Sequence, residues 1–424
     1  IGLVLSVGWI FLGLDIGFRF EAPDAVSLWL TLGGYRHTIA TVLALALIPV
    51  CGLEKRWGFL AAMVYVYMPY HLADIYVRGA LAEYAAFVWM PLALLAFHNL
   101  VERPSARRVA LAGLACGGLW MTHNVTGLAF TPFLVAYVLF RLLLETHRAG
   151  FTGARRWRDL LSRAGGALAA ALLGLGIAAA LLLPNLLERG YINQEQWVRT
   201  SYDYALHFVY PFQFLSPFWG YAPAAPGPED GMSFQLGAVP VILGVVATVS
   251  AFRRPRRERV VILFYAGATI LLVYLMLPVA APLWEVLPIA ALVQFPWRLL
   301  ALTSITLSVL SGLALSRGKA PSAASGLSSP SPTFNAPILI LALVAILASF
   351  PYTLPQYTPT PAGAEGPLLT IEFERKYDDM IGMTTWTQEL PPDSPLVEQY
   401  RTGGPLVTAE ALAPGATVDM IRAG

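Results

Sequence analysis

The chain has 424 residues, of which 57% are hydrophobic and only 13% are charged. A soluble globular protein carries about 25% charged residues, so this composition excludes an ordinary soluble domain and predicts an all-α polytopic membrane protein. The net charge of +2 leaves no basic face beyond what membrane topology explains, which argues against a nucleic-acid partner. Two cysteines are too few for a cysteine metal site, and no metal ligand set is predicted.

Apolar stretches that approach the length of a membrane span, about 17–25 residues, recur along most of the chain. We predict eleven spans, at residues 1–13, 38–52, 58–72, 84–100, 109–124, 127–144, 165–185, 235–251, 260–277, 297–316 and 336–351. The first is expected to be cut short, because the chain begins inside an apolar run with neither an initiator Met nor a signal peptide. The segment is therefore expected to be part of a longer protein.

The distribution of Lys and Arg predicts the orientation of the spans. The alternate connections at 53–57, 101–108, 141–164, 252–259 and 317–335 hold 18 of the 28 basic residues but only five of the 26 acidic residues. These connections are predicted to be cytoplasmic, in a bacterial cytoplasmic (inner) membrane. The connections on the other side, including residues 352–424, are then extracytoplasmic.

Four regions are predicted to differ in character. Residues 1–351 form the transmembrane domain, and within it 186–234 is an aromatic-rich extracytoplasmic loop. Its rings predict interfacial helices at headgroup level, or alternatively a groove for a lipid or sugar. Residues 318–334, rich in Ser and Pro, predict a flexible cytoplasmic linker, and 352–424 predicts a soluble extracytoplasmic tail that could begin a β domain.

Residues 68–83 carry four ionisable side chains between two apolar runs. Such groups are costly at the edge of hydrocarbon, so they usually pair, face water or take part in function. A helix that starts near Pro69 would place His71, Asp74 and Arg78 on one face, with both His71 and Arg78 in reach of the Asp74 carboxylate. Glu83 lies beyond the following turn and is expected to point elsewhere.

Two interpretations of this motif stay open. In the functional one, a carboxylate (Asp74 or Glu83) is the catalytic general base, while Arg78 binds an anion such as phosphate. In the structural one, an ion pair orders a re-entrant or interfacial helix.

Two further motifs lie at predicted outer ends of spans. His123 in Thr122-His123-Asn124 could bind an anionic headgroup, shuttle a proton or ligate a metal, but the motif could also simply satisfy backbone groups at a helix end. In Gln294-Phe295-Pro296-Trp297-Arg298, Trp297 and Arg298 suit interface anchoring. An Arg at an outer end nevertheless opposes the positive-inside trend, so phosphate binding by Gln294, Trp297 and Arg298 is equally open.

These motifs resemble those of a bacterial membrane-protein family labelled "6-pyruvoyl-tetrahydropterin synthase-related". The resemblance covers about residues 55–390 and is strongest in the run 69–83, followed by Pro91-Leu92, and in the two later motifs. Nothing in the chain resembles the soluble zinc synthase that gives the family its label.

That family is similar in layout to the GT-C glycosyltransferases, which take a sugar from a polyprenyl-phosphate donor at the outer membrane face. The resemblance implies such a donor, and membrane lipids as the surroundings. A GT-C catalytic carboxylate commonly lies in the first outside loop. Here that loop either precedes Ile1 or is 14–37, with Asp15, Glu21 and Asp24.

Three functions follow as hypotheses. The first is an inverting lipid-linked sugar transferase, in which Arg78 or Arg298 stabilises the departing phosphate and a divalent cation would only offset its charge. The second is a non-catalytic scaffold or accessory subunit with membrane-protein partners. A transporter ranks last, because no internal repeat and few deep ionisable groups occur. An enzyme predicts a water-lined outer pocket at Asp74, Arg78, His123 and Arg298, whereas a scaffold predicts closed pairs.

Overall fold

The computed structural model of the chain describes residues 55–148, 153–192, 202–229, 231–287, 292–316, 336–353 and 384–386. The chain divides into two compact units, one of Ile1–Leu183 with Asp203–Pro355, the other of Pro184–Tyr202 with Gln356–Gly424. The predicted spans at 1–13 and 38–52, the loop 14–37, the linker 318–334 and nearly all of the tail 352–424 lie outside the described residues.

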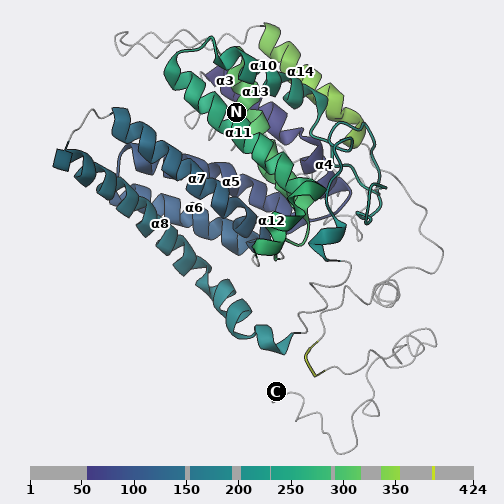
Figure 1. Cartoon of the computed structure of the whole chain (residues 1–424), viewed down its shortest axis with the longest axis horizontal. Helices are drawn as coiled ribbons and strands as arrows, with labels where there is room; N and C mark the ends of the chain where they lie inside the picture. Colours follow the sequence, from purple (N-terminus) through teal and green to yellow (C-terminus); the bar gives the residue numbers. More distant parts are fainter. Residues whose placement is uncertain are drawn as a thin grey trace, which may run out of the picture. The chain divides into compact units, whose positions relative to one another are not determined.

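Helices make up the larger unit (Figure 1), and no strand occurs among the residues described. The α-helices are α3 Lys55–Val66, α4 Pro69–Tyr76, α5 Leu81–Glu102, α6 Ala106–Thr122, α7 Asn124–Arg148, α8 Gly153–Leu187, α10 Ala238–Ala251, α11 Arg256–Met276, α12 Ala281–Val286, α13 Leu300–Leu315 and α14 Ala336–Ser349. Short 3₁₀ helices are η1 Arg189–Tyr191, η2 Tyr204–Leu206, η3 Pro278–Ala280, η5 Pro296–Leu299 and η6 Phe350–Thr353.

Six helical segments in the described ranges are long and apolar enough to cross a membrane. They are Leu81–Glu102, Asn124–His147, Gly153–Leu187, Arg256–Met276, Pro296–Leu315 and Ala336–Thr353. The helix α10 is also apolar but has only 14 residues. These helices support the predicted class of all-α membrane protein with several spans, whereas the count of eleven stays a prediction.

The structure corrects the prediction of one continuous span at 58–72. The helix α3 ends at Val66, Met68 is extended with φ −60° and ψ 134°, and Pro69 begins α4. Proline has no backbone N–H and restricts the residue before it to extended conformations, so it suits the first turn of a new helix. The predicted span is therefore two short helices joined by a break.

The predicted cytoplasmic loop at 141–164 is also largely helical. The helix α7 continues to Arg148 and α8 begins at Gly153, well before the predicted start of that span at 165. Ion pairs one helical turn apart support both extensions, because Arg141 Nη2 lies 2.8 Å from Glu145 Oε1 and Arg163 Nε lies 2.8 Å from Asp159 Oδ2. The charged residues that predict a loop instead continue the ends of α7 and α8.

The aromatic-rich loop does not form the expected interfacial helices within its described residues. Only η1 and η2 occur there, because Pro and Gly interrupt the segment repeatedly. Some of the rings pack on short helices of the larger unit instead: the centroids of Trp219 and Tyr352 are 4.4 Å apart, and those of Tyr204 and Trp284 are 5.4 Å apart.

The helix α13 is the centre of the larger unit. Every residue from Leu300 to Ala314 is buried, and the helix packs against α3, α10 and α11. Its hydroxyls donate to carbonyls three or four residues earlier, which satisfies them inside an apolar environment; they belong to Thr303, Ser304, Thr306, Ser308 and Ser311. Thr269 of α11 adds an interhelical bond, with 2.7 Å between its Oγ1 and that of Thr306.

The helices α5, α6, α7 and α8 lie side by side in Figure 1. The helix α5 packs on α6 and α7, and α6 meets α8 through glycine. A Cβ added at Gly117 would lie 2.8 Å from Ile177 Cβ, and one at Gly174 would lie 2.8 Å from Cys116 Cβ. Small residues at such spacings let membrane helices approach closely.

Within the smaller unit, residues 384–386 of the tail contact residues 190–192, near the start of the aromatic-rich loop. Ile192 and Thr384 form an isolated antiparallel bridge, and Thr385 N–H donates to the Tyr191 carbonyl over 3.1 Å. The ring centroids of Tyr191 and Trp386 are 5.5 Å apart. The prediction that the tail begins a β domain concerns residues that otherwise lie outside those described.

Candidate functional site: a buried ionic cluster

The turn between α4 and α5 brings Glu83 back to the end of α4, where Asp74 and Arg78 lie. The N–H of Arg78 donates to the Ala73 carbonyl over 2.9 Å, and Gly79 then takes φ +62°. This left-handed conformation is one that glycine adopts without steric cost, and it is common where helices end. The chain reverses there, and α5 begins two residues later. Glu83, in the first turn of α5, is thereby returned to the end of α4.

Arg78 forms hydrogen bonds to three other side chains of the site. Its Nη1 donates to Asp74 Oδ1, to Glu83 Oε2 over 2.9 Å and to the Tyr70 hydroxyl over 3.3 Å. The Tyr70 hydroxyl in turn donates to Glu83 Oε1 over 2.6 Å. Arg298 joins from η5, with 3.6 Å between its Nε and Glu83 Oε2. We call Tyr70, Asp74, Arg78, Glu83 and Arg298 the ionic cluster.

The third motif supplies Arg298 and holds it in place. Arg298 Nη1 donates over 2.9 Å to both the Val293 carbonyl and Gln294 Oε1. Gln294 has φ 65°, a left-handed conformation that is strained for a residue with a side chain. Trp297 provides a face for the other cation, because the Arg78 guanidinium carbon lies 4.6 Å from a ring centroid of Trp297.

The two kinds of charge differ in depth. The side chains of Asp74 and Glu83 are 0% and 2% exposed, whereas those of Arg78 and Arg298 are 16% and 13% exposed. The carboxylates therefore form the floor of the ionic cluster, and the guanidiniums form its rim. Although burial lowers the pKa of Arg78, the neighbouring Tyr70, Glu83 and Asp74 raise it above its ordinary value, so the cation is retained.

His123 belongs to the electrostatic surroundings of the ionic cluster. It lies between α6 and α7, where its Nδ1 is 2.7 Å from Thr126 Oγ1. Burial lowers the pKa of His123, and the charges of Glu83, Arg298 and Arg78 also act on it. Asn124 follows directly as the first residue of α7. The first and third motifs thus meet in the ionic cluster, and His123 of the second motif lies within range of its charges.

The structure corrects two details of the first motif. Glu83, expected to point elsewhere, is held by both Arg78 and Tyr70. His71, expected to bond the Asp74 carboxylate, lies in the aromatic core, with ring centroids 4.2 Å from both Tyr65 and Phe87. No hydrogen bond reaches its Nε2 within the described part of the chain.

Tyr70 was missed, although its position offered a signal. It precedes Asp74 by four residues on α4, so both side chains lie on the same helix face. A tyrosine there can accept from a cation and donate to a carboxylate at once, which is what it does between Arg78 and Glu83.

Neither of two hollows among the described residues is lined by a residue of the ionic cluster. One of about 170 Å³ lies beside Pro69, Gln235 and Tyr352, and one of about 770 Å³ lies between α5 and α6. The predicted convergence of Asp74, Arg78 and Arg298 is present, but these side chains are packed together. Within the described ranges, buried Asp74 Oδ2 and Trp297 Nε1 have no hydrogen-bond partner, which leaves polar atoms for water or a ligand.

Among the residues described, no group of three or more His, Cys, Asp or Glu side chains could hold a metal ion. The role of a divalent cation therefore stays a prediction.

No family model, curated protein or solved structure matches the chain. The family resemblance drawn from the motifs likewise stays a prediction. The fold and site define the chain as an α-helical membrane protein in which an ionic cluster of two arginines and two carboxylates joins α4, α5 and the start of α13.

Proposed function

We propose that the chain is a membrane-embedded transferase that takes a sugar from a polyprenyl-phosphate donor, and that the ionic cluster binds the donor phosphate. The observation that carries the proposal is the meeting of Arg78 and Arg298, which are 220 residues apart in sequence, over Glu83. Ionisable groups inside membrane proteins are expensive, and by default they point to a functional site.

The chemistry of the rim suits a phosphate. Two guanidiniums present planar sets of donors that match phosphate oxygens, and the carboxylates beneath fix them before the ligand arrives. Donors oriented in advance, in surroundings that exclude water, stabilise a developing negative charge more strongly than solvated ones. A departing polyprenyl phosphate would gain that stabilisation at Arg78 and Arg298.

The two carboxylates differ in how many of their oxygens already accept hydrogen bonds. Both oxygens of Glu83 are engaged, by Tyr70 and by Arg78, whereas Oδ2 of Asp74 has no hydrogen-bond partner within the described residues. Asp74 is therefore the proposed general base. It would take the proton of the acceptor hydroxyl as that oxygen attacks the sugar carbon and the lipid phosphate leaves with inversion. Glu83 would position Arg78.

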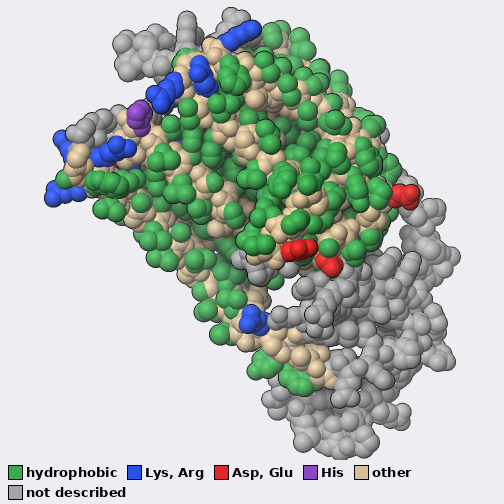
Figure 2. Space-filling model, in the orientation of Figure 1, with side chains coloured by type: hydrophobic (Ala, Val, Ile, Leu, Met, Phe, Trp, Pro, Cys, Tyr) green, Lys and Arg blue, Asp and Glu red, His purple; other side chains and the backbone are tan. Residues whose placement is uncertain are grey.

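The charge at the ends of the larger unit supports the orientation that this function needs. The helix α5 runs from the ionic cluster at Glu83 to the arginine-rich turn at 103–108, and its 22 residues extend about 33 Å, enough for a bilayer core. On the face shown in Figure 2, most blue side chains gather near the turns that join α7 to α8 and α10 to α11, while red ones lie near α12 and at the right edge of the view.

We place the basic end in the bacterial cytoplasm and the ionic cluster at the outer face. The helix α14 ends on the side of α4, since Ser349 Oγ donates to the Tyr67 carbonyl over 2.7 Å. The chain after Thr353 therefore starts at the outer face in this proposal.

Sugar transfer tests the proposal. Membranes that contain the protein would be supplied with polyprenyl-phosphate carrying a radiolabelled sugar, and release of label from the lipid would be measured. We expect Asp74→Asn to lower the rate at least about 100-fold, in line with loss of a general base. Glu285→Gln removes an exposed acid on α12 and should leave the rate unchanged. Equal rates in wild type and Asp74→Asn, with both folded, would contradict the proposed base.

A second candidate function is a non-catalytic scaffold or accessory subunit of a membrane complex. The observation that favours it is the closure of the site, because Asp74 and Glu83 are buried and both are bonded to Arg78. In that case the ionic cluster only stabilises the junction of α4, α5 and α13. Release of label would then be absent from wild type, and replacing Asp74 would change stability alone.

A further inference from the structure

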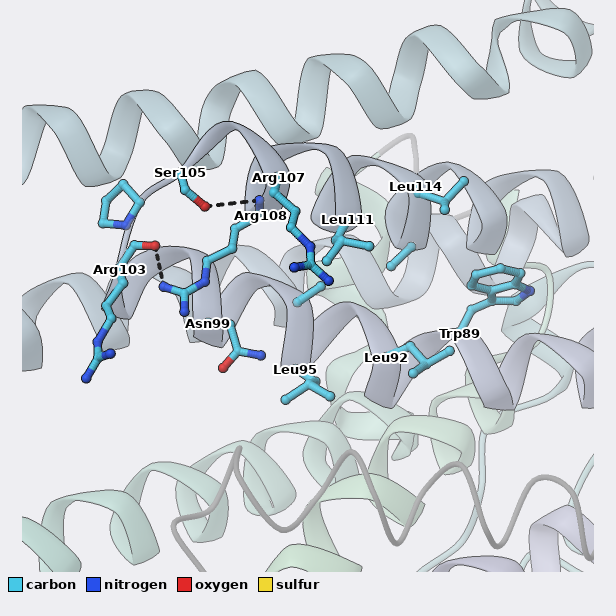
Figure 3. A pocket seen from close by; sticks show the side chains of 13 residues that line it. Trp89, Leu92, Leu95, Asn99, Arg103, Ser105, Arg107, Arg108, Leu111 and Leu114 are labelled. Atoms are coloured by element: carbon cyan, nitrogen blue, oxygen red, sulfur yellow. Dashed lines mark hydrogen bonds between the residues drawn. The ribbon is translucent and has the colours of Figure 1, made fainter. Parts of the chain in front are cut away.

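A hollow of about 770 Å³ lies between α5 and α6, near the turn that joins them (Figure 3). This is at the opposite end of α5 from Glu83 and the ionic cluster. Its volume is within the range of about 300–1,000 Å³ that is usual for ligand sites.

Arginines surround the polar end of this hollow. Arg108 is tied to the turn, since its Nη1 donates to the Arg103 carbonyl over 2.5 Å. In Figure 3 the side chains of Arg107 and Arg108 extend from α6 toward α5, which contributes Asn99 to the lining. Within the described part of the chain, no carboxylate pairs with the guanidinium of Arg103, Arg107 or Arg108. The polar end is therefore cationic, with no carboxylate partner among the residues that the structure describes.

The rest of the hollow is apolar and continues along the two helices. Leu92 and Leu95 line it from α5, and Leu111 and Leu114 line it from α6, with Trp89 at the far end in Figure 3. Leu111 and Leu114 are 49% and 53% exposed, so this surface is open to an outside ligand.

We infer that this hollow binds an anionic phospholipid of the leaflet that surrounds the basic end, with the phosphate at the arginines and an acyl chain along the leucines. Charge and shape together select this occupant, because a cationic end adjoins an apolar groove on a span long enough to cross a membrane. Basic pockets between membrane helices on the cytoplasmic side are typical sites for anionic lipid headgroups. The inference is independent of the transferase proposal.

Native mass spectrometry of the purified full chain tests the inference. The protein would be offered equal amounts of phosphatidylglycerol and phosphatidylcholine, and the retained lipids would be counted. We expect a preference for phosphatidylglycerol that falls about fivefold in Arg107→Gln and about 25-fold in Arg103→Gln/Arg107→Gln, from roughly 1 kcal/mol for each basic residue near a membrane surface. Ala96→Phe should reduce retention by filling the groove without changing charge.

Arg253→Gln is the matched control, because it removes an exposed arginine in the turn between α10 and α11 that does not line the hollow. It should retain the preference. Three results would overturn the inference: equal retention of the two lipids, an equal loss in Arg253→Gln, or complete displacement of phosphatidylglycerol by millimolar inorganic phosphate. The last would show a simple anion site rather than a lipid site.

Discussion

At the scale of single residues, Arg78 is the side chain that compensates the charge of both buried carboxylates in the ionic cluster. It is the shared donor for Asp74, Glu83 and Tyr70, and its guanidinium also covers Trp297. Buried carboxylates are tolerated only when their charge is compensated, because the interior solvates an isolated anion poorly. Removing this one cation would therefore leave two buried anions with Arg298 as the one cation paired with them among the described residues.

We expect Arg78→Met to lower the free energy of unfolding by about 3–5 kcal/mol, which is the usual cost of removing one partner from a buried ion pair. Denaturation of the purified protein in detergent, followed by circular dichroism, measures the change. Arg158→Met removes an exposed arginine on α8 and should cost less than about 0.5 kcal/mol. Similar small losses in both variants would mean that the pairs around Arg78 contribute little.

Only part of the ionic cluster could be predicted from the sequence, because two of its members reach it through a turn and through tertiary packing. Asp74 and Arg78 are four residues apart, so helical geometry alone brings them together. The position of Glu83 depends on the left-handed turn at Gly79, which a helical pattern does not encode. Arg298 arrives through tertiary packing of α13, and no spacing rule relates it to α4.

At the scale of elements, close helix contacts depend on glycine. Gly113 and Gly117 of α6 face Leu173, Gly174 and Ile177 of α8, without room for a further carbon. The sequence predicted that a helix occurs at α8, but it did not predict where this helix begins. The helix α8 has 35 residues, whereas the span predicted from hydropathy covered only 165–185. Its first turns are charged, and charge marks a membrane boundary more reliably than it marks a helix end.

Two glycines of α8 form a matched pair for testing this contact. A Cβ at Gly174 would meet Cys116 Cβ at 2.8 Å and the Gly113 carbonyl at 3.1 Å, whereas a Cβ at Gly176 would meet nothing within 4 Å. We expect Gly174→Ala to destabilise by about 1–3 kcal/mol through overpacking. Gly176→Ala should be neutral or stabilising by up to about 1 kcal/mol, from helix propensity. Thermal unfolding in detergent compares them, and equal effects would rule out a tight contact.

At the scale of the whole molecule, the distribution of charge is the main guide to orientation. The ionic cluster lies at the start of α5, and Arg107 lies in the first turn of α6, just after α5 ends. Glu285 on α12 follows the end of α11 that is distant from Arg256. The overall charge of +2 conceals this separation. The proposed donor site at the outer face requires that the arginine-rich turns lie in the cytoplasm.

Cysteine labelling tests this orientation. In a background without Cys51 and Cys116, Glu285→Cys should react with a membrane-impermeant maleimide added to intact spheroplasts. Arg107→Cys should react only after the membrane is permeabilised. The reverse pattern would place the ionic cluster on the cytoplasmic side and contradict the proposed donor site.

The most direct test of the central claim is the binding of polyprenyl phosphate to the purified protein, with the phosphate-free polyprenol as the comparison. We predict saturable binding of the phosphate form, at least about tenfold weaker binding of polyprenol, and a similar loss in Arg298→Gln, as expected for hydrogen bonds to a charged group. Arg253→Gln, in the turn between α10 and α11, should bind as wild type does. Equal affinity for the two lipids, or unchanged affinity in folded Arg298→Gln, would contradict a lipid-phosphate site at the ionic cluster.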